Sequence, residues 1–201
     1  MIKVTLKDGS VKEFPAGISA YEAAKEISTG LARNACAAKI NGKNADLRDT
    51  LNEDCELEIL TFDDEYGKRT FRHTASHIMA QAVNRLYPGT KFAIGPAVDN
   101  GFYYDIDSDV TFTPEVLAKL EAEMKKIIKE DIEIERFELP VAEALELMKG
   151  QDYKEELIRE HAAEGEHISF YKQGDFTDLC TGPHLMHTGN VKAVKLTSIT
   201  G

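Results

Sequence analysis

The sequence is poor in the features that mark secreted and membrane proteins. Its 201 residues include no tryptophan and only three cysteines, Cys36, Cys55 and Cys180, which are too few for a disulfide framework. No apolar run approaches the length of a membrane span, and residues 1–6 open a strand pattern rather than a signal peptide. These absences predict a cytoplasmic protein that does not engage a membrane.

The sequence also lacks a surplus of positive charge. Lysine and arginine number 24 against 35 aspartates and glutamates, which gives a formal net charge of −11. Proteins that bind nucleic acid nonspecifically draw most of their affinity from the neutralisation of phosphates by basic residues. Any RNA that this chain handles must therefore be recognised in a local pocket, with the electrostatic grip supplied elsewhere.

Residues 1–62 have the pattern of a small β-grasp (ubiquitin-like) domain, in which a sheet wraps around one helix. Two alternating segments flank an Asp-Gly turn at 8–9, which predicts a hairpin. Ser19 and Glu22 form a capping box that opens a short helix, and further strand patterns follow. The polar stretch 63–67 is expected to be a linker.

Residues 63–201 are expected to form a second, α+β domain with an antiparallel sheet and a cleft. Residues 70–86 show the apolar periodicity of an amphipathic helix, and the Asp-Asn-Gly turn at 99–101 lies between two β-rich segments. A threonine followed by proline at 113–114 opens another helix. The remaining predicted elements are helices over 140–148 and 152–162, and strands that begin at 132 or cover 168–171 and 191–199.

Two pairs of chemically active residues share one spacing. His73 and His77 are four residues apart on the predicted helix, so their side chains lie on one face, one turn apart. Cys180 and His184 repeat this spacing around the Gly-Pro turn signal at 182–183. Three imidazoles and a thiol brought together form either a tetrahedral metal site or a cluster of proton-transfer groups.

The surroundings of these residues qualify the prediction. His73 and His77 fall nearly opposite the apolar stripe of their helix, so two solvated histidines are the competing interpretation. Asp178 shares a strand face with the thiol two residues later, and its carboxylate could orient an imidazole or hold a cation. His161 and His167 lie among acidic and polar residues and are expected to face solvent.

Five motifs together carry a resemblance to a known family. They are His73-Thr74-Ala75-Ser76-His77, Ala93-Ile94-Gly95-Pro96, Asp99-Asn100-Gly101-Phe102-Tyr103-Tyr104-Asp105, Tyr153-Lys154 and Asp178-Leu179-Cys180-Thr181-Gly182-Pro183-His184. With them the chain closely resembles the N-terminal portion of bacterial threonyl-tRNA synthetase, over essentially its whole length. Residues 1–62 resemble the TGS domain of that family. Residues 63–201 resemble its editing domain, which is also similar to the editing part of alanyl-tRNA synthetase.

The resemblance implies post-transfer editing, in which the ester of mischarged Ser-tRNA(Thr) is hydrolysed at the 3′ aminoacylated end of the tRNA. Such a second site is needed because one missing methyl group is worth only about 1–3 kcal/mol of discrimination. The implied catalytic residues are His73, His77, Lys154, Cys180 and His184, and the implied substrate-binding residues are Asp178 and Tyr104.

The resemblance also suggests how the implied residues share the work. Either His73 or His184 would position or deprotonate the water, and Lys154 would be the cation near the developing negative charge or the leaving oxygen. Asp178 would hold the substrate amino group. Tyr104 would contact the terminal nucleotide or form a wall of the pocket. Cys180 is not expected to act as a covalent nucleophile, because nothing in the sequence indicates an activated thiolate.

The sequence stops at Gly201, before the aminoacylation core that follows in the family. The chain is therefore expected to be an N-terminal fragment of a threonine--tRNA ligase that forms no threonyl-tRNA by itself. ATP, magnesium and the catalytic zinc are expected only in the missing core. The parent enzyme is expected to be a homodimer through that core, and the fragment a monomer.

The editing site is expected to need no cofactor, and the alternative is zinc held by His73, His77, Cys180 and His184. Three other functions remain open. They are a free-standing deacylase that works in trans, a zinc hydrolase with a small substrate, and a noncatalytic binding module that a structural metal stabilises.

Overall fold

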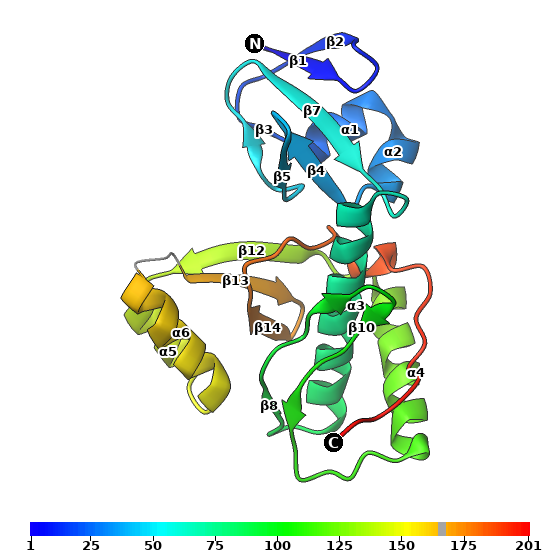
Figure 1. Ribbon diagram of the computed structural model, residues 1–201, viewed down its shortest axis with the longest axis vertical. Coiled ribbons are helices and arrows are strands. Elements are labelled where there is room, and N and C mark those ends of the chain that lie inside the picture. Colours follow the sequence, from blue (N-terminus) through cyan, green and yellow to red (C-terminus); the bar gives the residue numbers. More distant parts are fainter. Residues whose placement is uncertain (165–167) are drawn as a thin grey trace. The chain divides into compact units, whose positions relative to one another are not determined.

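The computed structural model has an α+β fold (Figure 1) and describes residues 1–164 and 168–201, without the side chains of 163 and 164. The expectation for His167 therefore falls outside the described residues. Tertiary contacts divide the chain into two compact units. The first unit comprises Met1–Arg72 and Gly182–Met186, and the second comprises His73–Thr181 and His187–Gly201.

The first unit is a β-grasp fold, as predicted. Its five-stranded sheet has the order β2-β1-β7-β4-β5, in which the central pair β1 and β7 is parallel and the other pairs are antiparallel. Two short helices and a two-stranded ladder of β3 and β6 complete it. The bounds are β1 Ile2–Leu6, β2 Val11–Phe14, β3 Ile18–Ser19, α1 Ala20–Ile27, α2 Thr29–Asn34, β4 Ala37–Ile40, β5 Lys43–Ala45, β6 Thr50–Leu51 and β7 Cys55–Leu60.

Local sequence signals explain much of this unit. The predicted capping box is present, because the Ser19 hydroxyl accepts from the Glu22 amide while the Glu22 carboxylate accepts from the Ser19 amide. Alternation along β1 buries Ile2 and Val4 and leaves Lys3 exposed. These side chains join a core under the sheet that includes Phe14, Ala20, Ala23, Leu47, Leu51 and Leu57.

Helix α3 (Glu65–Leu86) starts earlier than the periodicity predicts. The expected linker at 63–67 is wrong, because Glu65, Tyr66 and Gly67 already belong to the helix. A Cβ atom at Gly67 would lie 1.9 Å from the Thr61 carbonyl oxygen, so only glycine allows the first turn to approach the end of β7 this closely. The glycine that indicates a flexible linker in the sequence is a close-packing position instead.

The second unit contains an antiparallel sheet of order β12-β13-β14. These strands cover Ile134–Leu139, Ile168–Gln173 and Phe176–Leu179. Helices α5 (Val141–Leu147) and α6 (Asp152–Glu164) lie beside the sheet (Figure 1). A core cluster joins the helices to the strands, and its buried members are Ala144, Met148, Ile158, Ile168, Phe170 and Leu179.

Short ladders and helix α4 (Pro114–Glu130) complete the second unit. The predicted hairpin at 99–101 is confirmed by the pairing of β9 (Ala97–Val98) with β10 (Gly101–Phe102), and β8 (Lys91–Phe92) pairs with β11 (Ile106–Asp107). The 3₁₀ helix η1 covers Thr188–Asn190.

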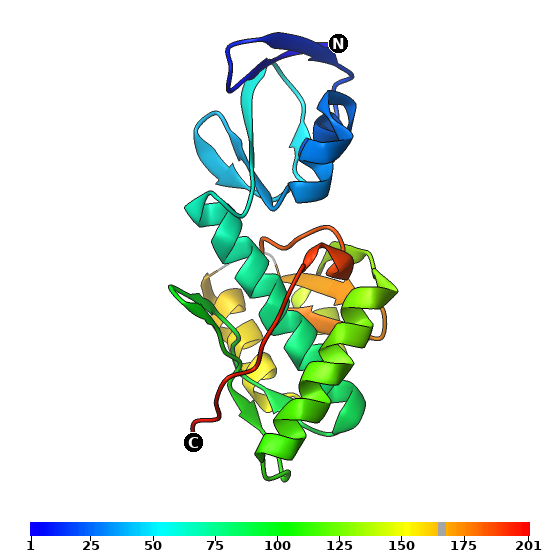
Figure 2. The same ribbon diagram turned by 90° about the vertical axis from the view of Figure 1, so that its right-hand side faces the viewer.

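The strand predicted over 191–199 is wrong, because that segment has no regular secondary structure. In Figure 2 it starts beside the C-terminal end of α4 and then diverges from that helix toward the end of the chain. The Leu196 amide donates to the Glu121 carboxylate at 3.1 Å, and the Lys195 ammonium forms an ion pair with the same group. The Glu121 carboxylate on α4 thus accepts the hydrogen bond that the backbone of a neighbouring strand would accept in a sheet.

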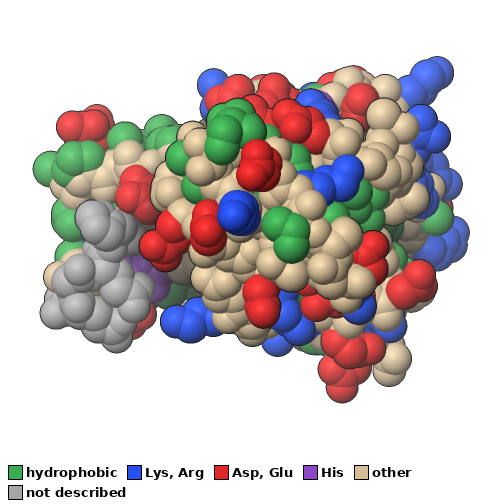
Figure 3. Space-filling model, turned by 90° about the horizontal axis from the view of Figure 1, so that it is seen from above, with side chains coloured by type: hydrophobic (Ala, Val, Ile, Leu, Met, Phe, Trp, Pro, Cys, Tyr) green, Lys and Arg blue, Asp and Glu red, His purple; other side chains and the backbone are tan. Residues whose placement is uncertain are grey.

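The surface is mixed in charge where it can be viewed. Acidic and basic side chains are interspersed with hydrophobic ones on the face shown in Figure 3. No helix in the described part of the chain is long and apolar enough to span a bilayer.

Thr188 offers a test of how the second unit is held together. Its fully buried hydroxyl accepts from the Ile132 amide at 2.9 Å and donates to the Ile127 carbonyl at 2.8 Å. Thr188→Val keeps the shape of the side chain but removes both hydrogen bonds, so the free energy of unfolding should fall by about 1–3 kcal/mol. Urea denaturation measures this loss. Thr177→Val on β14 is the control and should change stability by less than about 0.5 kcal/mol; equal losses in both variants would contradict the assignment.

Candidate active site

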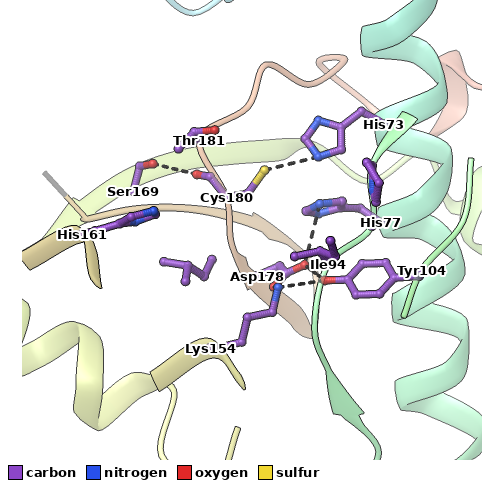
Figure 4. A pocket seen from close by; sticks show the side chains of 13 residues that line it. His73, His77, Ile94, Tyr104, Lys154, His161, Ser169, Asp178, Cys180 and Thr181 are labelled. Carbon is purple, nitrogen blue, oxygen red and sulfur yellow. Dashed lines mark hydrogen bonds and ion pairs between the residues drawn. The ribbon is translucent and has the colours of Figure 1, made fainter. Parts of the chain in front are cut away.

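A cavity of about 340 Å³ opens in the second unit (Figure 4). Its walls come from α3, from the loops that follow β8 and β10, from α6, and from β13 and β14 with the residues just beyond them. This volume lies in the range of small-molecule sites. Six of the seven residues that the sequence nominated line it: His73, His77, Tyr104, Lys154, Asp178 and Cys180.

Helix α3 supplies both nominated histidines, with ring centroids 4.9 Å apart and planes at 87°. His73 is partly buried, whereas His77 is only 3% exposed. Two solvated histidines are therefore excluded. The polar face of α3 does not meet solvent, because Thr74, Ser76 and Gln81 on this helix are also fully buried. The sequence places the polar stripe correctly but cannot show that protein covers it.

A buried ion pair lies at the base of the cavity. The Lys154 ammonium on α6 is 2.9 Å from the Asp178 carboxylate on β14, and both side chains are at most 4% exposed. The Tyr104 hydroxyl donates to Asp178 and accepts from Lys154 at 2.9 Å. Nε2 of His77 lies 3.7 Å from Oδ2 of the same carboxylate, which is the oxygen that also accepts from Tyr104. A carboxylate and an ammonium removed from water need this kind of mutual satisfaction.

The electrostatics of this group follow from burial and pairing. Burial, the largest single influence, acts to raise the pKa of Asp178, but the nearby charges of Lys154 and His77 and the hydrogen bonds from Lys154 and Tyr104 together outweigh it, so the pKa lies below its usual value. Burial lowers the pKa of His77 to about 3, although Asp178 opposes the shift. Burial and then the negative charge of Asp178 raise the pKa of Tyr104 well above its usual value. At neutral pH the site thus holds an ionised Asp178 carboxylate, a neutral His77 imidazole and a protonated Tyr104 phenol.

Cys180 follows the last residue of β14 and is held by the adjacent strand. Its amide donates to the Ser169 carbonyl at 3.2 Å, and the Ser169 hydroxyl donates to the Cys180 carbonyl at 2.6 Å. These bonds continue the β13–β14 ladder by one residue. The Cys180 Sγ atom lies 3.5 Å from Nε2 of His73, so the thiol and the imidazole face each other across the cavity (Figure 4).

Gly95 fixes the place of Tyr104. A Cβ atom at position 95 would lie 2.2 Å from the Tyr104 ring, and the Gly95 carbonyl accepts from the Ser76 hydroxyl at 2.6 Å. The loop after β8 is therefore tied to α3 on one side and pressed against the phenol ring on the other. Phe92 packs edge-on against the same ring, with centroids 5.6 Å apart.

His184 lies in the segment that belongs to the first unit. Its side chain is 1% exposed, and its amide donates to the Asp46 carboxylate at 3.3 Å. The contribution of His184 to a site with Cys180 stays a prediction from the sequence spacing. The expectation that His161 faces solvent is wrong, because this residue is partly buried and lines the cavity from α6. His161 lies on the same face of α6 as Lys154, because seven residues span about two helical turns.

Several lining residues escape prediction from the residues alone. Ser169 and His161 have no motif of their own, and only the register of β13 against β14 or the helical phase of α6 brings them to the cavity. The Ile94-Gly95-Pro96 segment belongs to a motif that the resemblance uses, yet nothing in its composition marks it as a wall.

The donor set suits a zinc ion. Ligand atoms of His73, His77 and Cys180 lie within 4.8 Å of one another. Zinc bound at usual distances separates a nitrogen and a sulfur ligand by about 3.6 Å, close to the 3.5 Å between His73 and Cys180. However, Nε2 of His77 faces Asp178. Zinc would therefore have to use Nδ1 of this ring or displace the carboxylate.

Comparison with protein-family models finds two matches in this chain. The TGS domain model matches residues 2–61, and the model described as "Threonyl and Alanyl tRNA synthetase second additional domain" matches residues 168–201. The β-grasp unit thus matches a TGS domain, and the C-terminal part of the chain, which carries Asp178 and Cys180 of the cavity, matches a domain of threonyl- and alanyl-tRNA synthetases.

Among individual proteins, the chain is similar to threonine--tRNA ligases. The chain is 62% identical to those of Clostridium botulinum (strain Kyoto / Type A2) and Clostridioides difficile (strain 630), and 61% identical to that of Clostridium tetani (strain Massachusetts / E88). Each match covers 100% of this chain and 32% of the relative. The chain thus spans about a third of these relatives and is similar to their N-terminal region.

Removing the Lys154 ammonium tests whether the Lys154–Asp178 pair stabilises the fold. Lys154→Met keeps most of the apolar stem but leaves the Asp178 carboxylate buried without its partner, so stability at neutral pH should fall by about 3–5 kcal/mol. Chemical denaturation of this variant and of the double variant Lys154→Met with Asp178→Asn measures the coupling. The double variant should recover part of the loss, because no uncompensated charge remains. A double variant whose losses simply add would show that the pair is not coupled.

Proposed function

We propose that the second unit hydrolyses the ester of seryl-tRNA(Thr), releasing serine and free tRNA. The observation that carries this proposal is the convergence of His73, Cys180 and the Lys154–Asp178 pair on one cavity, in a chain 62% identical to threonine--tRNA ligases. A site for ester hydrolysis needs a positioned water, a proton acceptor and a cation or donor for the oxyanion. Side chains able to fill these roles line this cavity.

The chemistry of the cavity supports an assignment of roles. Water adds to the ester carbonyl as its proton passes to an imidazole, and the tetrahedral intermediate then collapses to release the ribose hydroxyl, which takes up a proton. We assign the proton acceptor to His73, because it is less buried than His77 and does not face Asp178. His184 is the alternative acceptor.

Lys154 would stabilise the negative charge that develops on the carbonyl oxygen, since its buried ammonium acts in a low-dielectric environment. Asp178 would attract the ammonium of the aminoacyl group, and the Tyr104 hydroxyl orients that carboxylate. Cys180 would position the water together with His73 rather than attack the ester.

The tRNA would reach the cavity through its aminoacylated 3′ end. The formal net charge of −11 provides no general attraction for phosphate. We therefore place recognition in the cavity, whose size suits an aminoacyl group with part of its nucleoside. The names of the relatives describe the ligation of threonine to tRNA.

Substrate selectivity and metal dependence are tested together. The purified chain should hydrolyse Ser-tRNA(Thr) at least about tenfold faster than Thr-tRNA(Thr), because the additional methyl group must be excluded sterically. Rates from acid-precipitable labelled amino acid, with and without a chelator, check both points. Hydrolysis should survive chelation. Loss of activity on chelation that zinc restores would contradict the metal-free mechanism, and equal rates on both esters would contradict the proposed selectivity.

The assignment of the proton acceptor has its own test. His73→Ala should lower the single-turnover rate of seryl-tRNA hydrolysis by about 10²–10³-fold, the usual contribution of a general base, with little change in unfolding midpoint. His187→Ala is a matched control, because this histidine lies outside the cavity lining and should leave the rate within about twofold. An unchanged rate in His73→Ala would refute the assignment.

A further inference from the structure

The segment Gly182–Met186 is held by the first unit. It clusters with Met1–Arg72 rather than with the strand that precedes it. His184 and Leu185 are at most 1% exposed, and Met186 packs against the hydrophobic core of the β-grasp fold. A five-residue excursion of the chain is therefore a part of the TGS unit in its packing.

Two charged side chains of the TGS unit hold the backbone of this segment. The Arg48 guanidinium donates to the carbonyl of His184 at 2.9 Å and to that of Leu185 at 2.7 Å, using two different nitrogens. The Asp46 carboxylate accepts from the His184 amide at 3.3 Å and pairs with Arg48 at 2.9 Å. The peptide groups on both sides of the His184 Cα atom are thus fixed.

The pair that does the holding is itself preorganised. Asp46 and Asp49 close a tight turn, in which the Asp49 amide donates to the Asp46 carbonyl and the Asp46 amide donates to the Asp49 carboxylate, both at 3.0 Å. The Arg48 amide donates to the Asp46 carboxylate at 2.8 Å. Hydrogen bonds to ionised groups are about twice as strong as neutral ones, and a guanidinium fork reaches two acceptors where an ammonium reaches one.

We propose that Asp46 and Arg48 are positioning residues for His184, and we call their contacts to the backbone at 184–185 the clamp. The inference rests on the proposed function for the role of His184, which follows Cys180 by four residues. The two side chains set the backbone from which the imidazole projects. They act through His184 and do not touch substrate.

The test combines a measure of the clamp with a measure of catalysis. Arg48→Ala, Arg48→Lys and the wild-type chain are compared by amide hydrogen exchange across 182–186 and by kcat and KM for Ser-tRNA(Thr) hydrolysis. Lys7→Ala is the control, because Lys7 forms an exposed ion pair with Glu58 elsewhere in the same unit. Circular dichroism verifies that each variant is folded.

Arg48→Ala should speed exchange at 182–186 by about 10- to 100-fold relative to the rest of the unit, since charge-assisted bonds are lost. Its kcat should fall by about 10- to 100-fold with KM changed less than about threefold, because a misplaced catalytic group costs rate rather than binding. Arg48→Lys keeps the charge but reaches one carbonyl, so it should be intermediate in both measurements. Even if Arg48→Ala does not fold, Arg48→Lys carries the test.

Three results would decide against the proposal or separate it from the proposed function. Unchanged exchange at 182–186 would overturn the clamp. A raised KM with unchanged kcat would overturn the positioning role and indicate that Arg48 contacts tRNA. Faster exchange in a chain whose wild type hydrolyses neither ester would support the clamp and contradict the proposed function alone.

Discussion

The candidate site depends on the buried ion pair between Lys154 and Asp178. It joins α6 to β14, and through the Tyr104 hydroxyl it also secures the loop after β10. An ammonium and a carboxylate this far from water are tolerable only when each is satisfied by the other and by further hydrogen bonds. Together with the core cluster that joins α6 to β13 and β14, the pair therefore fixes the distances among three elements, and the cavity opens where they meet.

Helix α3 shows how a fold can bury a polar surface for use. Thr74, Ser76, His77 and Gln81 are fully buried, and several of them bond to distant segments: Ser76 to the Gly95 carbonyl, and Gln81 to the backbone and side chains near the β13–β14 turn. A helix that is polar on a covered face must find partners there. Those partners hold the loop after β8 and the β13–β14 hairpin around the two imidazoles.

Local signals in the sequence predicted most elements of the fold. The Ser19 capping box, the Thr113-Pro114 helix start and the hairpin turns depend on neighbours a few residues away, so a single sequence suffices. The start of α3 and the course of 191–199 were missed, because a close approach to Thr61 and the Glu121 carboxylate decide them. Lys154 shows the same limit in the site, since its sequence neighbourhood is that of an exposed helical lysine and only the resemblance nominated it.

The close approach of Gly95 to Tyr104 couples one wall of the cavity to the network of Tyr104, Asp178 and Lys154, so neither can move without the other. Any side chain at position 95 would meet the phenol ring at 2.2 Å and push it away from Asp178 and Lys154. The dimensions of the cavity on this side are therefore not adjustable independently of its electrostatics. Changes in the size of the ligand that the cavity admits must come from other lining positions, such as His161 on α6 and Thr181 beyond β14, which are not members of the ion pair.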